Sequence, residues 1–235
     1  MRSSRGSDLA TILVRGLILI GFFFVLAYGY ALIIEARLGV APWVTLHIGL
    51  TNHLPLTVGR ATQLVGLAVI LLALALGVRP RIGTWLNMIL VGYFLDLVMA
   101  AGLLPPASGP ARSWLYLFLG SVVMGLGVAG YLSAGFGAGP RDSLMLGLTR
   151  ITGRPVGGVR TGLELAALGT GYLLGGPVGA GTVISALLGG PALQFWLALL
   201  GPVARTRLGG RLLSPPAARG FRPFAPPVPG GRPGG

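Results

Sequence analysis

Cysteine and lysine are both absent from the 235-residue chain, and only five residues are acidic. Without cysteine the chain cannot form a disulfide framework, a thiol nucleophile or a thiolate-ligated metal site. Charged residues make up 10% of the sequence, whereas a soluble domain of this size has about a quarter. So few charges could not cover the surface of a soluble protein, and 53% of the residues are apolar. The composition therefore predicts an integral membrane protein.

Six apolar runs are long enough to be transmembrane helices, at roughly 16–34, 61–78, 82–101, 113–134, 161–175 and 181–202. The first begins directly after Arg15 and no small-residue cleavage site clearly follows it, so we interpret it as a retained anchor. We predict an all-α polytopic fold. Its parts are a cytoplasmic N-terminus (1–15), a three-span repeat (16–101), an outer loop (102–112), a second three-span repeat (113–202) and a disordered Arg/Pro/Gly-rich cytoplasmic tail (203–235).

All eighteen basic residues are arginine, and their positions indicate the orientation. With the N-terminus inside, fifteen arginines fall on the cytoplasmic side and only Arg37, Arg60 and Arg112 fall outside. We therefore expect a multi-pass protein of the bacterial plasma membrane with both termini cytoplasmic. In a soluble protein the net charge of +13 would suggest nucleic acid, but topology explains it here. The expected partner is the lipid bilayer and not nucleic acid, and the sequence leaves the oligomeric state open.

A repeat with a spacing of 98 residues relates the two parts of the chain. Leu38–Thr51, "LGVAPWVTLHIGLT", and Phe136–Thr149, "FGAGPRDSLMLGLT", are identical at six of fourteen positions. About one or two identities are expected by chance in so biased a composition. Downstream, Arg60 aligns with Arg160 after a two-residue shift. Since each half has three spans, an odd number, we expect an inverted-topology repeat, which is typical of many secondary transporters.

Each Gly-Pro segment is followed by an apolar stretch of about nine residues, which is too short to span a bilayer. Proline favours the first turn of a helix, and the preceding glycine permits a tight turn. We expect a short helix after Pro42 and another after Pro140. These helices either are re-entrant and line a cavity, or lie flat at opposite membrane surfaces. Two such breaks at corresponding positions favour a central solute site.

The blocks "RLGVAPWVTLHIGL", "VGRATQLVGL" and "IGTWLNMILVGYFLDLV", and the later blocks "GFGAGPRDSLMLGL" and "GAGTVISALLGGPALQFWL", carry a family resemblance. Over roughly residues 12–200 the chain resembles the YczE/YitT-type bacterial integral membrane proteins. The resemblance implies a polytopic membrane fold and no particular substrate, since the biochemical activity of that family is not established in general. The chain departs from the pattern by its long tail, and by Ser185 and Gln194 where the first half has Asn87 and Asp96.

Few polar groups lie within the apolar runs. Asp96 either contacts an ion or solute, or lies near a helix end and pairs with Arg112 or Arg37. Glu164 follows Arg160 at the i, i+4 spacing of a helical ion pair, and Asp142 falls in the first turn of a short helix, where the dipole favours a carboxylate. The candidate substrate or cavity residues are Gly39, Pro42, Thr45, Arg60, Asn87, Asp96, Gly137, Pro140, Asp142, Ser143, Arg160 and Glu164.

No pattern of catalytic or metal-binding residues is present in the sequence. His47 and His53 are the only histidines, and no carboxylate lies at ligand spacing on the same face. We therefore expect no metal, no cofactor and no enzymatic activity. The leading prediction is a transporter or channel-like protein for a small anionic or zwitterionic solute. The alternative is a membrane scaffold or regulatory protein that does not transport.

Overall fold

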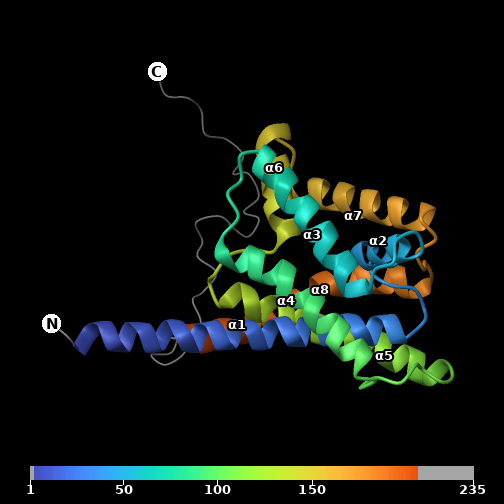
Figure 1. Ribbon diagram of the computed structural model, residues 1–235, viewed down its shortest axis with the longest axis horizontal. Coiled ribbons are helices and arrows are strands. Elements are labelled where there is room, and N and C mark those ends of the chain that lie inside the picture. Colours follow the sequence, from blue (N-terminus) through green and yellow to red (C-terminus); the bar gives the residue numbers. More distant parts are fainter. Residues whose placement is uncertain (1–2, 206–235) are drawn as a thin grey trace, which may run out of the picture.

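The structure is a computed structural model that describes residues 3–205, and every regular element in this range is an α-helix (Figure 1). The predicted all-α fold is therefore confirmed. Most of the predicted tail lies outside the described residues, but α8 continues through Arg205, so the predicted boundary at 203 is too early. The helices are α1 (Ser3–Glu35), α2 (Pro42–Thr51), α3 (Val58–Ala75), α4 (Ile82–Ala100), α5 (Pro110–Ser133), α6 (Pro140–Thr152), α7 (Val156–Leu173) and α8 (Ala180–Arg205).

Five of these helices are long and apolar enough to cross a membrane. They are Thr11–Glu35 within α1, all of α3, α4 and α5, and Ala180–Gly201 within α8. The sixth predicted span, 161–175, corresponds to α7, which is not among them. Arg160, Glu164 and several glycines lower the mean hydropathy of α7. The count of six spans is therefore not confirmed.

The two short helices begin at the prolines of the repeated motif, as predicted. Pro42 is the first residue of α2, which has 10 residues, and Pro140 is the first residue of α6, which has 13. Proline suits this position because its φ is already helical and its missing N–H would have no partner in the first turn. Gly39 and Gly137 precede them with φ values of +95° and +125°, where a side chain would be strained.

Helix boundaries in the two parts of the chain differ by the same 98 residues as the sequence repeat. Both ends of α3 and α7 keep this offset, as do the starts of α2 and α6, the starts of α4 and α8, and the ends of α1 and α5. We call residues 11–101 the first half and residues 110–201 the second half. The two-residue shift that aligned Arg60 with Arg160 is wrong, because Arg60 is the third residue of α3 and Arg160 is the fifth of α7.

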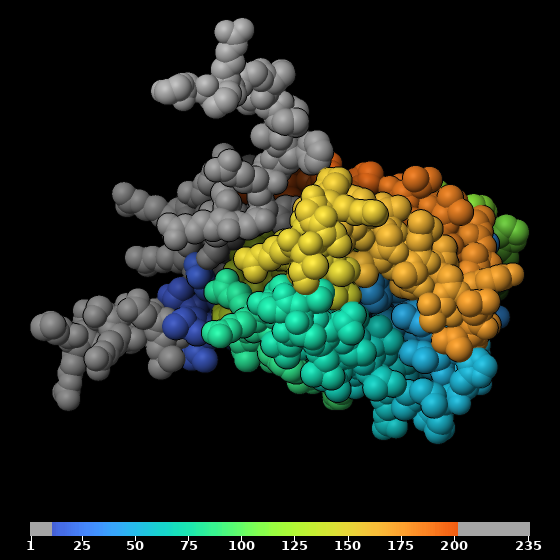
Figure 2. Space-filling view, turned by 90° about the horizontal axis from the view of Figure 1, so that it is seen from above, coloured from blue at the N-terminus to red at the C-terminus, as the bar shows by residue number. Residues whose placement is uncertain are grey.

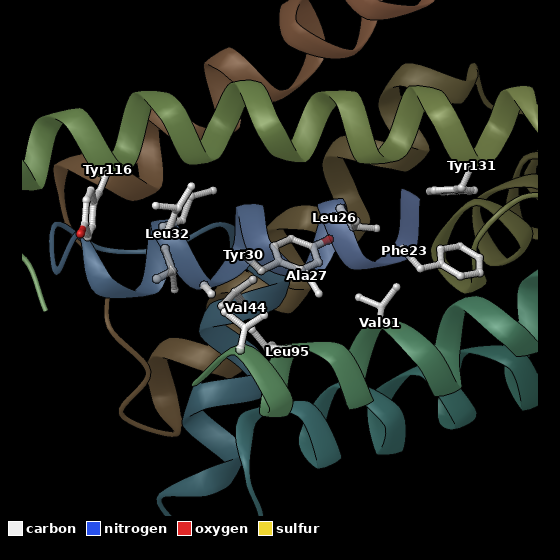
Figure 3. Close-up of a cluster of buried hydrophobic side chains, with 14 of the residues drawn as sticks. Phe23, Leu26, Ala27, Tyr30, Leu32, Val44, Val91, Leu95, Tyr116 and Tyr131 are labelled. Atoms are coloured by element: carbon white, nitrogen blue, oxygen red, sulfur yellow. The ribbon is translucent and has the colours of Figure 1, made fainter. Parts of the chain in front are cut away.

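Helix α1 packs against α5 on one side and α4 on the other (Figure 3). Glycines bring α1 and α5 into backbone contact. A Cβ at Gly29 would lie 2.6 Å from the Met124 nitrogen, and one at Gly127 would lie 2.6 Å from the Leu26 Cα. Adding 98 to Gly29 and Leu26 gives Gly127 and Met124, so the 98-residue offset converts each of these contacts into the other. The crossing of α1 and α5 is therefore centred near Ala27.

Each short helix packs on a long helix of the opposite half. Helix α2 contacts α7, and α6 lies beside α3, as Figure 2 shows for the yellow and teal surfaces. Gly49 of α2 faces Leu174, and Gly147 of α6 faces Leu76, again at the same offset. The Gly181 N–H at the start of α8 donates to the Leu38 carbonyl over 2.7 Å.

The start of α4 makes a hydrogen bond that corresponds, at the 98-residue offset, to the one between Gly181 and Leu38. The Gly83 N–H donates to the Phe136 carbonyl over 3.1 Å. In addition, the Thr84 hydroxyl donates to the Ala138 carbonyl over 2.7 Å. The first turn of a helix has N–H groups without partners inside the helix. A backbone carbonyl of each Gly-Pro segment therefore accepts a hydrogen bond from one such N–H group at the start of the last helix of the other half.

Candidate functional site

The N-terminal turns of α2 and α6 meet inside the bundle. Trp43 is the second residue of α2, and Arg141 is the second residue of α6. The Cζ atom of Arg141 lies 5.3 Å from the centroid of the Trp43 ring, which is the distance of a cation–π contact. Two positions related by the 98-residue offset are thus in direct contact. This contact places a guanidinium between the starts of two helices.

The guanidinium of Arg141 has few protein partners. Its Nη2 donates to the Tyr30 hydroxyl of α1 over 2.5 Å. Within the part of the chain whose side chains are described, Arg160–Glu164 is the only ion pair, so Arg141 is not paired with a carboxylate. A guanidinium carries five N–H donors. Arg141 is half-buried and retains donors for another acceptor.

Polar groups of α4, α5 and α6 lie near the start of α6. The Tyr131 hydroxyl of α5 donates to Oδ2 of Asp142 over 3.2 Å. The buried Ser143 hydroxyl donates to the Gly139 carbonyl over 3.1 Å. Asn87 of α4 lies next to the same segment, because its Oδ1 is 3.7 Å from a Cβ built on Gly139. The structure therefore brings the predicted residue Asn87 to the segment that leads into α6, where Asp142 and Ser143 directly follow Arg141.

The α2 side of the contact is more apolar and packed. Thr45 is fully buried, and its Oγ1 lies 3.3 Å from the Ala41 carbonyl and 3.4 Å from the Pro177 carbonyl. His47 Nδ1 lies 3.0 Å from Thr62 Oγ1. Burial, and secondly the charge of Arg141, lower the pKa of His47 from 6.5 to about 3. His47 is therefore a neutral imidazole at physiological pH.

Asp96 lies elsewhere and stabilises the start of α3. It accepts a hydrogen bond from the Thr57 hydroxyl over 2.5 Å and one from the Gly59 N–H over 2.8 Å. A carboxylate is favoured here because the N-terminus of a helix carries partial positive charge. The predicted pairing with Arg112 or Arg37 is wrong. Arg112 instead donates to the Tyr116 hydroxyl over 2.8 Å.

Asp96, Arg60 and Arg160 do not reach the contact between α2 and α6. Asp96 and Arg60 line a hollow of about 330 Å³ on the outer surface of α3 and α4. Arg160 is exposed on α7 and pairs with Glu164 over 3.0 Å, which confirms that predicted ion pair.

Sequence reasoning missed the residues at the centre of this arrangement. Arg141 was counted only as a cytoplasmic arginine that sets topology, and Trp43, Tyr30 and Tyr131 were not considered. One signal was available, because Arg141 directly follows Pro140 in the repeated motif and corresponds to Trp43 at the 98-residue offset. That both side chains turn towards each other depends on how the two short helices approach in space.

Comparison with known proteins identifies the family. Residues 13–198 match the model of a family of unknown function, DUF6198. The chain belongs to the DUF6198 family. It is 42% identical over 175 residues to the uncharacterized membrane protein YczE of Bacillus subtilis (strain 168), covering 74% of this chain and 80% of that protein. An uncharacterized protein of Haemophilus influenzae is 34% identical over 176 residues, covering 75% of this chain and 80% of the relative.

The predicted resemblance to YczE-type proteins is thus confirmed. This DUF6198 protein is also similar to the uncharacterized protein YyaS of Bacillus subtilis, at 28% identity over 178 residues, with 75% of this chain and 89% of the relative covered. No solved structure matches the chain. Membership of DUF6198 and the likeness to YczE make the chain an integral membrane protein whose helices include several apolar candidate spans. None of these names states a substrate.

Proposed function

We propose that this protein transports a small anionic or zwitterionic solute, or conducts it as a channel, and that Arg141 binds the solute. The observation that carries this proposal is the meeting of Arg141 with Trp43 between the starts of α2 and α6. An ionisable residue inside a membrane bundle is costly and usually functional. Arg141 has no carboxylate partner among the described side chains, so an anion would complete its hydrogen bonding.

We further propose that the two halves form an inverted repeat of three spans each, with α7 as the sixth span and both termini cytoplasmic. The constant offset of 98 residues between helix boundaries supports this arrangement. So do the reciprocal contacts of Gly29 and Gly127 across α1 and α5. In inverted-repeat transporters, the starts of interrupted helices face the solute near the middle of the bilayer.

The chemistry of the arrangement favours a solute with a planar anionic group. Helix N-termini carry partial positive charge, and two of them converge here. The guanidinium fork of Arg141 matches a carboxylate, sulfonate or phosphate with two parallel hydrogen bonds. Asp142, which accepts only the Tyr131 hydroxyl among the described groups, is one residue away and would bind the ammonium of a zwitterion.

No residue of α2 or α6 lines the hollow on α3 and α4. We propose that a solute enters when α2 and α6 separate. Helices α3 and α4 pack on each other, whereas their counterparts α7 and α8 scarcely touch. We propose that α7 and α8 are the elements that move.

Binding and uptake together test the proposal. Wild-type protein is screened by thermal shift against carboxylates, sulfonates and phosphates, and uptake of any hit is measured in proteoliposomes. A ligand at a hundred times its Kd stabilises by about 2.7 kcal/mol. We expect Arg141→Gln to abolish both the shift and the uptake. Arg160→Gln, which removes an exposed arginine of the second half, should leave both unchanged.

One observation favours the alternative, a scaffold or regulatory protein that does not transport. The Gly-Pro segments are packed, and α7 and α8 expose large apolar side chains, including Leu173 and Leu187. If no anion shifts the wild-type melting temperature and none is taken up, the transport proposal is wrong and this alternative stands. If a hit binds equally to Arg141→Gln, the assignment of the site is wrong.

A further inference from the structure

The hollow of about 330 Å³ on α3 and α4 carries two opposite charges that the proposed solute site does not use. It is lined by Arg60 and Gln63 of α3, and by Tyr93, Asp96, Leu97 and Ala100 of α4. Arg60 and Asp96 do not form an ion pair with each other, because Arg160–Glu164 is the only ion pair among the described side chains. The hollow therefore presents a cation and a carboxylate that are separate from each other.

The carboxylate of Asp96 is fixed in position and keeps acceptor capacity. One of its oxygens accepts the Thr57 hydroxyl, and the other accepts the Gly59 N–H at the start of α3. An ionised carboxylate has about four acceptor sites on its two oxygens. Asp96 can therefore accept further N–H donors from a ligand in the hollow without losing its bonds to α3.

Arg60 supplies the positive charge of the hollow. It is exposed, and its guanidinium forms no ion pair with a carboxylate of the described residues. A guanidinium presents its N–H donors in a planar fork that matches two oxygens of a phosphate. Arg60 is also the third residue of α3, where the partial positive charge of the helix N-terminus adds to its own. This side of the hollow therefore favours a phosphate.

The hollow is level with the boundary between lipid and water. It is formed by the first two turns of α3 and the last two turns of α4, and both helices are candidate spans. Helix α3 has 18 residues and is about 27 Å long at about 1.5 Å per residue. The hydrocarbon core is about 30 Å thick, so the first turn of α3 reaches its edge. The exposed Tyr93 fits this level, because tyrosine is enriched at the membrane–water interface.

An exposed apolar stripe runs along α3 from the hollow towards the middle of the membrane. Leu64, Leu67 and Leu71 follow Arg60 at intervals of four, three and four residues, and all three leucines are exposed. These intervals place them on the helical face of Arg60. Leu97 of the hollow is also exposed on α4. A lipid can therefore contact the hollow with its headgroup and this stripe with an acyl chain, which a soluble ligand cannot do.

We propose that this hollow binds the headgroup of phosphatidylethanolamine, with the phosphate on Arg60 and the primary ammonium on Asp96. Two methylene groups separate the phosphate ester from the ammonium, so one headgroup reaches a cation and a carboxylate that do not pair with each other. A choline headgroup has no N–H to donate to Asp96, and a glycerol headgroup has no positive charge. The second half lacks this site, because Gly158 and Gln194 stand at the positions of Arg60 and Asp96. This inference does not depend on transport.

Native mass spectrometry of the full chain in mild detergent tests the proposal. The protein is titrated with phosphatidylethanolamine, phosphatidylcholine and phosphatidylglycerol of the same acyl chains, and lipid-bound protein is then challenged with soluble phosphoethanolamine. We expect one phosphatidylethanolamine to bind about tenfold more tightly than either other lipid, the difference that one hydrogen bond to a charged group makes. Soluble phosphoethanolamine at the same concentration should not displace it.

Two variants separate the two ends of the headgroup. Arg60→Gln should weaken the binding of phosphatidylethanolamine and of phosphatidylcholine about fivefold each, because both lipids carry the phosphate. Asp96→Asn should instead abolish the preference for phosphatidylethanolamine over phosphatidylcholine and leave the affinity for phosphatidylcholine unchanged. A merely structural role of Asp96 would not change this ratio.

Arg79→Gln is the matched control, because Arg79 is exposed at the opposite ends of the same two helices and does not line the hollow. It should bind all three lipids as the wild type does. Equal affinity of the wild type for the three lipids, a preference that persists in Asp96→Asn, or an equal loss in Arg79→Gln and Arg60→Gln would each overturn the proposal. Displacement by soluble phosphoethanolamine would overturn the assignment to a lipid. If Asp96→Asn does not fold, the selectivity of the wild type and Arg60→Gln, a change at an exposed position, decide the matter.

Discussion

The two halves share helix boundaries but differ in how their last two long helices are joined. In the first half α3 packs on α4, and Asp96 of α4 accepts hydrogen bonds from Thr57 and Gly59 at the start of α3. In the second half α7 and α8 scarcely touch, and Gln194 and Pro155 stand at the positions of Asp96 and Thr57. Proline has no hydroxyl to donate, so this link is absent there.

The difference shows that one duplicated framework supports a tight pair and a loose pair of helices. Close approach of α3 and α4 depends on glycine as well as on Asp96. A Cβ on Gly59 would lie 2.0 Å from the Gly92 carbonyl oxygen, whereas Gly157 and Gly190, at the corresponding positions, have no heavy atom within 4 Å of a built Cβ. Helix α7 is held instead by α2 of the first half.

The largest expected effect is all-or-none, and it concerns the side of the membrane on which each half exposes its short helix. Leu54 lies just after α2, and Thr152 is the last residue of α6. Both side chains are exposed, and the two positions are 98 residues apart. Since the chain has no cysteine, Leu54→Cys and Thr152→Cys each supply a single thiol. A membrane-impermeant maleimide should label Leu54→Cys only in right-side-out vesicles and Thr152→Cys only in inside-out vesicles. Labelling of both from one side would contradict the inverted repeat.

The next largest effect is on the stability of the tight pair. Gly59→Ala should lower the free energy of unfolding by about 3 kcal/mol, because the added methyl forces α3 away from the Gly92 backbone. Gly157→Ala, its counterpart, should be neutral or stabilise by about 0.5–1 kcal/mol through helix propensity. Unfolding in SDS/detergent mixtures followed by tryptophan fluorescence measures both. Equal losses in the two variants would mean that α7 and α8 are as closely packed as α3 and α4.

Removal of the Asp96 carboxylate should have a somewhat smaller effect. Asp96→Ala leaves the Gly59 N–H and the Thr57 hydroxyl without their acceptor, at a cost of about 2 kcal/mol. Gln194 is exposed, so Gln194→Ala should change stability by less than about 0.5 kcal/mol. The same unfolding assay applies. If Asp96→Ala is as stable as Gln194→Ala, the carboxylate does not hold α3.

The smallest expected effect is a pH dependence of folding stability that comes from His47 of the first half. The pKa of His47 is lowered to about 3, so the folded state favours the neutral ring and loses stability as pH falls below about 6.5. Between pH 7.5 and pH 5.5 the loss should be about 1 kcal/mol. His47→Met, which copies Met145 of the second half, should remove this part of the pH dependence. An unchanged pH profile in His47→Met would show that His47 does not titrate on unfolding.

The local features of the fold could be predicted from the sequence, and the partners of polar residues could not. Pro42 and Pro140 begin helices because proline acts on its own backbone and that of its neighbours. The pair of Arg160 and Glu164 was predicted because both residues lie on one helix. Asp96 was assigned the wrong partners, because its acceptor role depends on Thr57 and Gly59, which lie on another helix.

The sequence by itself determined that this chain is a helical membrane protein with a 98-residue repeat, since apolar runs, glycines and prolines act over a few residues. Only the tertiary structure decided that Arg141 faces Trp43 and Tyr30. The physical reason is that these contacts join residues that are distant along the chain. Which residues meet is decided by the glycine-dependent crossings of helices, and these depend on backbone distances that no local pattern encodes.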